Sequence, residues 1–149
     1  MIDGGSYGAG VGGEKSLWPV LAAVSAGGVL GALARYGLAT AWPHRSDEFA
    51  WATLITNVSG CLLIGVLMVL VTEVYPNQRL LRPFLGVGVL GGFTTFSTYV
   101  VDVGHAATAG AVGTAFAYFL ATVVGALVAV WIGVTATSRV VALRRTARP

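Results

Sequence analysis

Residues 85–103 read LGVGVLGGFTTFSTYVVDV, an apolar run that is interrupted at its centre by glycines and hydroxyl side chains. The run is about as long as the roughly 20 residues that a helix needs to cross a bilayer. Gly91 and Gly92 precede four serine or threonine residues within positions 94–98. Glycine is permissive and hydroxyls compete for backbone hydrogen bonds, so this stretch predicts a broken helix. The alternative is a continuous helix whose hydroxyls bond to the preceding turn.

The composition of the whole chain is typical of a membrane protein. Of its 149 residues, 56% are hydrophobic and only 10% are charged, whereas soluble domains carry roughly 25% charged residues. Three further apolar segments lie at about 17–42, 50–74 and 111–137. Because lipid offers backbone amides no hydrogen-bond partner, the four segments are expected to be helices. We therefore predict an all-α membrane protein with four transmembrane helices per subunit.

The chain is predicted to consist of one membrane domain between two tails. Glycine-rich residues 1–15 show no apolar period, which predicts a disordered N-terminal tail. Residues 16–141 are expected to form the four-helix transmembrane domain, and residues 142–149 a basic C-terminal tail. The single cysteine, Cys61, cannot form an internal disulfide.

The basic residues are distributed unequally between the two sides of the predicted membrane. Four spans place both termini on one side, which then collects Lys15, Arg79, Arg82, Arg139, Arg144, Arg145 and Arg148. The opposite side has Arg45 alone, with Arg35 inside the first segment. The positive-inside rule therefore predicts both termini in the cytoplasm. We expect a multi-pass protein of the inner (plasma) membrane.

Small residues recur at helical spacing in three of the segments. Lipid tails are as apolar as leucine, so membrane helices associate through close packing of small residues. Gly27 and Gly31 share one face of the first segment, and Gly88 and Gly92 share one face of the third. The fourth segment carries a predicted continuous ridge of Ala117, Ala121, Gly125, Ala129 and Gly133. The pattern predicts a tightly packed bundle.

Polar residues inside the spans require an explanation, because placing a polar side chain in hydrocarbon costs free energy. Arg35 is either a helix-end charge that reaches the interface or a fixed positive charge beside an anion's vestibule. Asn57 on the second segment either makes an interhelical hydrogen bond or replaces water around an anion with its amide donors. Tyr118 and Thr122 share a face of the fourth segment and carry the same two interpretations.

Aromatic residues follow the predicted break. Phe96 and Tyr99 are one turn apart if the helix resumes after the break. A phenyl ring has a negative face and a positive edge, so ring edges can approach an anion. The other interpretation is ordinary packing against lipid or protein.

These motifs, in this order and spacing, resemble those of the Fluc/CrcB fluoride channel family. The matching stretches are GGFTTFSTY at 91–99, GALARY at 31–36 and TLITNVSG at 53–60, with Tyr118 and Thr122 on the fourth segment. The resemblance covers about residues 17–141. It implies a dimer of four-span channel subunits in antiparallel orientation, with two pores and a third helix broken at mid-membrane. The implied function is passive export of fluoride from the cytoplasm, which relieves fluoride toxicity.

The resemblance also implies roles for individual residues. The backbone carbonyls of Gly91 and Thr94 would hold a structural sodium ion at the dimer interface. Phe96 and Tyr99 would form a phenyl box around the fluoride path, although the family usually has phenylalanine where this chain has Tyr99. The remaining pathway residues would be Arg35, Asn57, Thr98, Tyr118 and Thr122, where the last position is often serine.

Other functions fit the sequence less well. A small multidrug-resistance-type transporter subunit also has four short spans, but it needs a carboxylate in the first span to couple protons, and this first span has none. A structural subunit without a pore would use the same polar residues for packing. An enzyme is least supported, because Ser97 has no evident base and His105 lies near a span end. The expected partners are fluoride, sodium and the lipid bilayer, and no nucleic acid.

The charge asymmetry bears on the identity of the dimer partner. An antiparallel homodimer requires insertion in both directions, so its loop charges should nearly balance. The seven-to-one distribution instead favours one orientation. The partner is therefore either a second copy of this chain or an oppositely oriented homologue.

Overall fold

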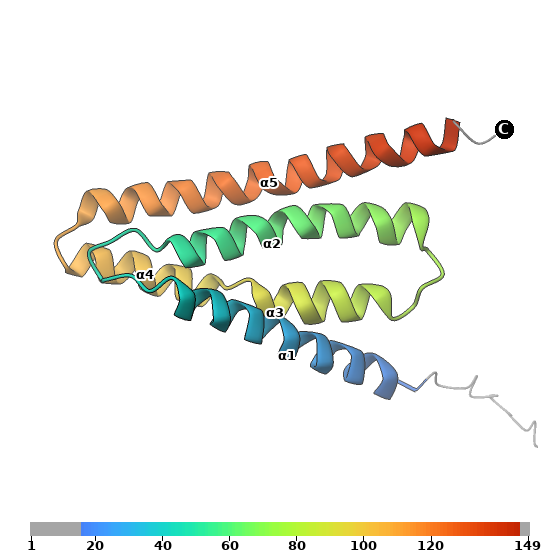
Figure 1. Ribbon diagram of the computed structural model, residues 1–149, viewed down its shortest axis with the longest axis horizontal. Helices are drawn as coiled ribbons and strands as arrows, with labels where there is room; N and C mark the ends of the chain where they lie inside the picture. Colours follow the sequence, from blue (N-terminus) through green and yellow to red (C-terminus); the bar gives the residue numbers. More distant parts are fainter. Residues whose placement is uncertain (1–15, 147–149) are drawn as a thin grey trace, which may run out of the picture.

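The structure is a computed structural model that describes residues 16–146; the predicted tail at 1–15 and the last three residues lie outside it. The described chain is all-helical and has four apolar helices that are long enough to cross a membrane, as predicted. In chain order the elements are α1 (Trp18–Ala41), α2 (Trp51–Val69), the π-helical η1 (Leu70–Val74) and η2 (Arg82–Leu90), α3 (Gly91–Phe93), α4 (Phe96–Thr108) and α5 (Val112–Thr146) (Figure 1). Residues 142–146, predicted as part of a basic tail, continue α5 as helix.

The first helix packs against the η2–α3 segment through glycines. A Cβ atom placed on Gly88 would lie 2.9 Å from the Cα atom of Gly27, and one placed on Gly31 would overlap the carbonyl oxygen of Val89. Such contacts bring the two backbones close together. Membrane helices associate through close packing of this kind, because in lipid the hydrophobic effect does not drive helices together. The two glycine faces predicted for the first and third segments are therefore confirmed as one interface.

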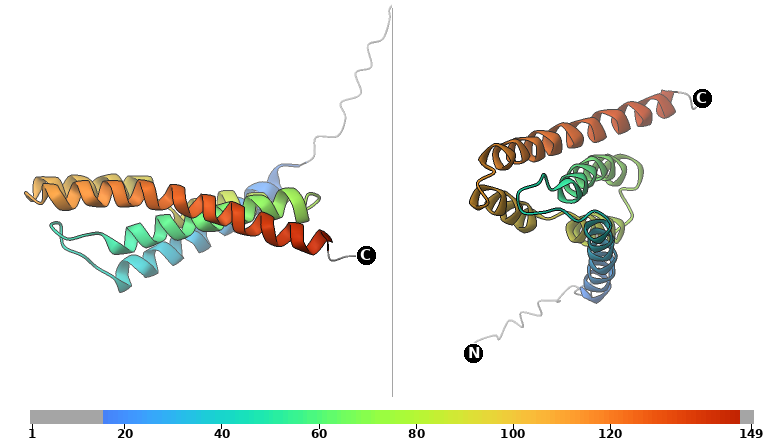
Figure 2. Two further views of the ribbon diagram at one scale, coloured as in Figure 1. Left: turned by 90° about the horizontal axis from the view of Figure 1, so that it is seen from above. Right: turned by 60° about the vertical axis from the view of Figure 1, so that its left-hand side comes forward.

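The small-residue ridge predicted on the fourth segment forms an interface only in its second half. There α5 crosses α2, and a Cβ atom on Gly133 would lie 3.3 Å from the Cα atom of Gly65. Ala117 and Ala121, in the first half, are exposed. The first half instead packs through Tyr118 and its neighbours, because α5 begins beside α4 before it crosses α2 (Figure 2). The crossing thus turns a different face of the helix inward at each end.

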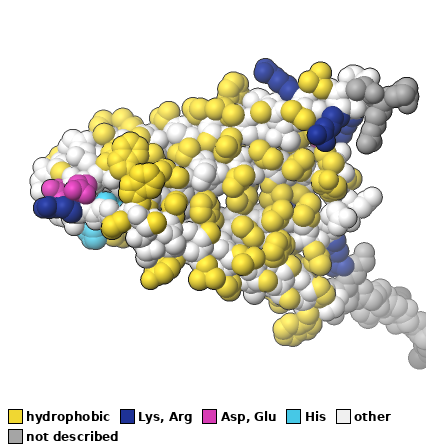
Figure 3. Space-filling model, viewed as in Figure 1, with side chains coloured by type: hydrophobic (Ala, Val, Ile, Leu, Met, Phe, Trp, Pro, Cys, Tyr) yellow, Lys and Arg dark blue, Asp and Glu magenta, His cyan; other side chains and the backbone are white. Residues whose placement is uncertain are grey.

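The two ends of the bundle differ in charge. The start of α1, the turn at 75–81 and the end of α5 lie at one end, with the loop at 42–50 and the turn at 109–111 at the other (Figure 1). Lysine and arginine side chains gather at the first end, whereas acidic side chains, histidine and one basic group mark the second (Figure 3). The start of α1 and the end of α5 therefore lie together at the basic end, as the span count predicts.

Two threonines separate α3 from α4. Thr94 (φ −74°, ψ 156°) and Thr95 (φ −149°, ψ 122°) have extended backbone. The Thr95 hydroxyl then accepts a hydrogen bond from the amide of Thr98 at 3.1 Å and so caps the N-terminus of α4. The interruption lies inside the stretch whose glycines and hydroxyls disfavour a continuous helix.

Candidate functional site

Asn57 joins α2 to the interruption between α3 and α4. Its Nδ2 donates to the carbonyl oxygen of Thr95 at 2.9 Å, and the amide of Thr95 donates to its Oδ1 at 2.8 Å. Asn57 is buried, so this double hydrogen bond holds the extended backbone in place. The interhelical interpretation of Asn57 is therefore correct, but it uses only one of the two Nδ2 hydrogens. Among the described residues, the bond to Thr95 is the one hydrogen bond that Nδ2 donates.

Two backbone carbonyls at the interruption lose the amide partner that a continuous helix would give them. In a continuous helix the amide of Thr95 would bond the carbonyl of Gly91, but here it bonds Asn57. The amide of Thr98 would likewise bond the carbonyl of Thr94, but it bonds the Thr95 hydroxyl. Carbonyls released at a broken membrane helix are the groups that coordinate sodium ions in transporters. Gly91 and Thr94 are the two residues predicted to hold sodium, so their chemistry fits that ion.

An open groove of about 450 Å³ runs along this interruption, between α2 and α5. Most of the predicted pathway and sodium residues line it together: Asn57, Gly91, Thr94, Phe96, Tyr99 and Thr122. They come from four different elements, so the fold brings together residues that are up to 65 positions apart in sequence, from Asn57 to Thr122.

The hydroxyl of Thr122 is the unusual polar group of this groove. The side chain is 5% exposed, and among the described residues its Oγ1 has no hydrogen-bond partner. Leaving a buried hydroxyl unpaired costs about 1–3 kcal/mol. A polar ligand that reached this hydroxyl would remove that cost.

The two aromatic residues of the predicted box lie together but differ in exposure. The rings of Phe96 and Tyr99 have centroids 5.9 Å apart. Phe96 is 78% exposed, whereas Tyr99 is buried against Tyr118, with ring centroids 5.5 Å apart in an edge-on arrangement. The Tyr99 hydroxyl donates to the backbone carbonyl of Phe119 at 3.1 Å. This hydroxyl therefore anchors the ring to α5.

Arg35 and Thr98 lie apart from the groove. They line a separate cavity of about 220 Å³ between α1 and α2. The Nε of half-buried Arg35 donates to the carbonyl of Gly92 at 3.2 Å, so this arginine braces the backbone just before the interruption. Thr95 lines both cavities. The interrupted backbone thus separates the two predicted groups of pathway residues.

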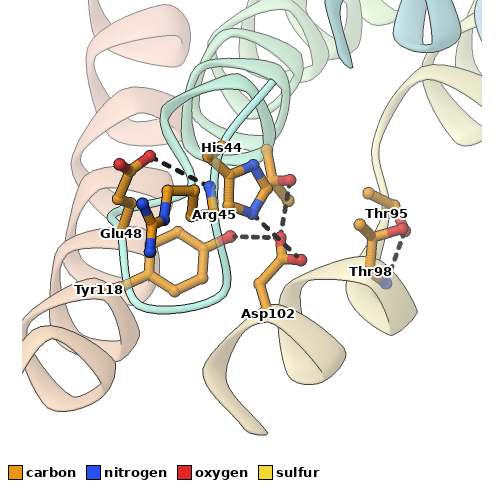
Figure 4. A network of polar contacts seen from close by, with 8 residues as sticks. His44, Arg45, Glu48, Thr95, Thr98, Asp102 and Tyr118 are labelled. Atoms are coloured by element: carbon orange, nitrogen blue, oxygen red, sulfur yellow. Dashed lines mark hydrogen bonds and ion pairs between the residues drawn. The ribbon is translucent and has the colours of Figure 1, made fainter. Parts of the chain in front are cut away.

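Tyr118 contacts Asp102, a residue for which the sequence alone predicts no role. Its hydroxyl lies 3.4 Å from Oδ2 of Asp102, which also accepts a hydrogen bond from the Thr53 hydroxyl at 2.9 Å (Figure 4). Nε2 of His44 lies 3.7 Å from the other carboxylate oxygen. The sequence contained a usable signal, because Asp102 follows Thr98 by four residues and so shares its helix face.

Comparison with known proteins identifies relatives along most of the chain. The sequence model of the family described as CrcB-like protein, Camphor Resistance (CrcB), matches residues 22–134. The chain is 48% identical over 133 residues to fluoride-specific ion channel FluC 1 of Streptomyces coelicolor, covering 89% of this chain and 86% of the relative. It is 54% identical over 114 residues to fluoride-specific ion channel FluC 2 of Nocardia farcinica, covering 76% and 81% respectively.

Proposed function

The chain belongs to the CrcB family, and we propose that it is a subunit of a fluoride-specific ion channel in the inner membrane. Four spanning helices make it a multi-pass membrane protein. The observation that supports the proposal most strongly is the groove, which is lined both by Asn57 and by Thr122, a residue whose buried hydroxyl has no partner among the described residues. The channel exports fluoride passively from the cytoplasm and so confers fluoride resistance.

The chemistry of the groove suits a small, strongly hydrated anion. Such an ion enters a narrow path only where donors replace its water. The second Nδ2 hydrogen of Asn57 and the hydroxyl of Thr122 supply donors, and the rings of Phe96 and Tyr99 supply positive edges. Tyr118 continues the polar path beyond the groove. Larger halides are excluded because they fit among these donors poorly.

A sodium ion, when bound at the interruption, would supply a fixed positive charge. The carbonyls of Gly91 and Thr94 would hold it, since their helical amide partners bond elsewhere. Two carbonyls are too few ligands for a buried cation, but a second subunit related by a twofold axis doubles their number. In this arrangement the third span is broken at mid-membrane, at the centre of the dimer.

The groove is completed by a second subunit in the opposite orientation. It is open in the single chain, and the apolar side chains of Phe96 and Leu127 on its rim are exposed. An antiparallel partner covers both and forms two pores. Tags at both termini distinguish the two candidate partners: a mixture of orientations indicates a homodimer. A single fixed orientation indicates an inverted homologue.

Purified protein in liposomes tests the function directly. With potassium flux provided by an ionophore, vesicles loaded with fluoride are expected to release it, and vesicles loaded with chloride are expected to retain it. A fluoride electrode and a chloride electrode measure the two rates. Equal release of both ions would contradict fluoride selectivity.

Replacing Thr122 with valine is expected to slow fluoride release roughly tenfold, because one hydrogen bond to an anion is lost. Stability should be unchanged or slightly higher, since the hydroxyl has no partner among the described residues. The matched control is Thr135→Val on the same helix, whose hydroxyl bonds the carbonyl of Trp131. Efflux assays and thermal unfolding in detergent check both parts. Equal efflux from the Thr122 variant and wild type would remove this hydroxyl from the pathway.

Replacing Tyr99 with phenylalanine is expected to cost about 1 kcal/mol of stability, because the hydrogen bond to Phe119 is lost. Fluoride efflux should stay within about twofold of wild type, since the ring and its packing on Tyr118 remain. Chemical unfolding and efflux measure the two effects. A variant of normal stability that has lost most of its flux would show that the hydroxyl serves the ion rather than the fold.

A further inference from the structure

We propose that His44 and Asp102 form a charge pair at one mouth of the fluoride path, and that protonation of His44 sets how fast fluoride passes that mouth. The inference rests on the proposed channel function. The mouth is a cavity of about 600 Å³ at the end of the bundle opposite the termini, lined by His44, Asp47 and Glu48 from the loop and by Thr114 from α5.

Asp102 is a nearly buried carboxylate whose hydrogen bonds leave one oxygen for His44. Only 11% of its side chain is exposed. Oδ2 faces the hydroxyls of Thr53 and Tyr118, whereas Oδ1 faces Nε2 of His44 at 3.7 Å. Within residues 16–146, His44 is the one cationic partner of Asp102, because Arg45 pairs with Asp47 at 3.3 Å. The charge of this carboxylate is therefore balanced only when His44 is protonated.

Side-chain contacts connect the pair to residues that line the groove. Thr122 lines the groove, and Tyr118 lies one turn before it on α5. The Tyr118 ring packs on Tyr99, which also lines the groove, and its hydroxyl reaches Asp102. Figure 4 shows Tyr118 and His44 converging on Asp102 from two elements. In this proposal the anion follows these groups from the groove, so it passes the carboxylate before it reaches the mouth.

The charge of the pair depends on whether His44 carries a proton. Histidine gains its proton between about pH 8 and pH 5, while carboxylates and guanidinium groups ordinarily keep their charge there. The other charged groups at the mouth are Asp47, Glu48 and Arg45. With His44 protonated the pair is neutral. With His44 neutral the Asp102 charge repels fluoride, so flux should fall as pH rises.

The test is a pH series of fluoride efflux with equal pH on both sides of the vesicle, corrected at each pH with protein-free vesicles. Wild type is expected to conduct roughly fivefold faster at about pH 5.5 than at about pH 8, the effect of one partly screened charge. His44→Gln should be slow at both values, and His44→Lys fast at both. The control is His105→Gln, because the chain has two histidines and His105 is exposed on α4.

A flat wild-type profile, or a His44→Gln variant that keeps the wild-type profile, would overturn the inference. Wild type without fluoride flux at any pH would instead refute the channel function. The pair is tested independently of flux by melting temperatures near pH 5.5 in detergent. His44→Gln should lower the melting temperature of wild type but not of Asp102→Asn. An equal loss in both backgrounds would show that the two residues do not interact.

Discussion

Fluoride flux is expected to disappear when Asn57 is replaced by aspartate, with a loss of more than about a hundredfold, or roughly 2.7 kcal/mol. The change removes both amide hydrogens, including the one that bonds the carbonyl of Thr95 at 2.9 Å. It also sets a negative charge in a buried position that lines the groove. Initial rates of efflux from liposomes, at equal amounts of reconstituted protein, measure the loss.

The matched control is Asn77→Asp, which makes the same chemical change in the exposed turn between η1 and η2. This variant should conduct like wild type. Gel filtration in detergent must show that both variants elute as the wild type does. An Asn57→Asp protein that elutes normally and conducts within about threefold of wild type would exclude the amide from the pathway.

The largest loss of stability is expected from Gly31→Ala. The new methyl group would overlap the carbonyl oxygen of Val89 and lie 2.8 Å from the amide nitrogen of Phe93. Both atoms belong to the backbone, so α1 must move away from η2 and α3, and the hydrogen bond from Arg35 to Gly92 must stretch. We expect a cost of about 3 kcal/mol or more, at the upper end of overpacking. Chemical unfolding in detergent micelles measures it.

Gly37→Ala on the same helix is the control for helix propensity. A Cβ atom at that position meets nothing within 4 Å. Alanine is the better helix former, so this variant should be neutral or more stable by about 0.5–1 kcal/mol. If both alanine variants lost the same stability, close packing at Gly31 would not explain the effect.

The parts of the fold that depend on local sequence could be predicted without a structure. Apolar length defines each span, and four-residue spacing placed Gly27, Gly31, Gly88 and Gly92 on facing surfaces. The prediction of a continuous packing ridge on the fourth segment was wrong for its first half, because a helix that crosses its neighbour changes its buried face along its length. Ala117 and Ala121 therefore keep the right spacing but face outward.

The partners of the polar residues could not be predicted, because each partner comes from a distant part of the chain. Residue type alone left Asn57 between a structural and a ligand-binding role, and its bond to the Thr95 backbone required the fold. Arg35 likewise bonds Gly92 across 57 positions. Asp102 was missed for the same reason, since the loop that carries His44 folds back over α4.

The most direct test of the channel is the reversal potential of the reconstituted protein in a planar bilayer. With unequal fluoride and equal chloride on the two sides, a fluoride-selective passive channel gives a current that reverses at the equilibrium potential of fluoride. That is the result expected here. A current that reverses at zero voltage, where chloride is balanced, or no current at any voltage, would contradict the account.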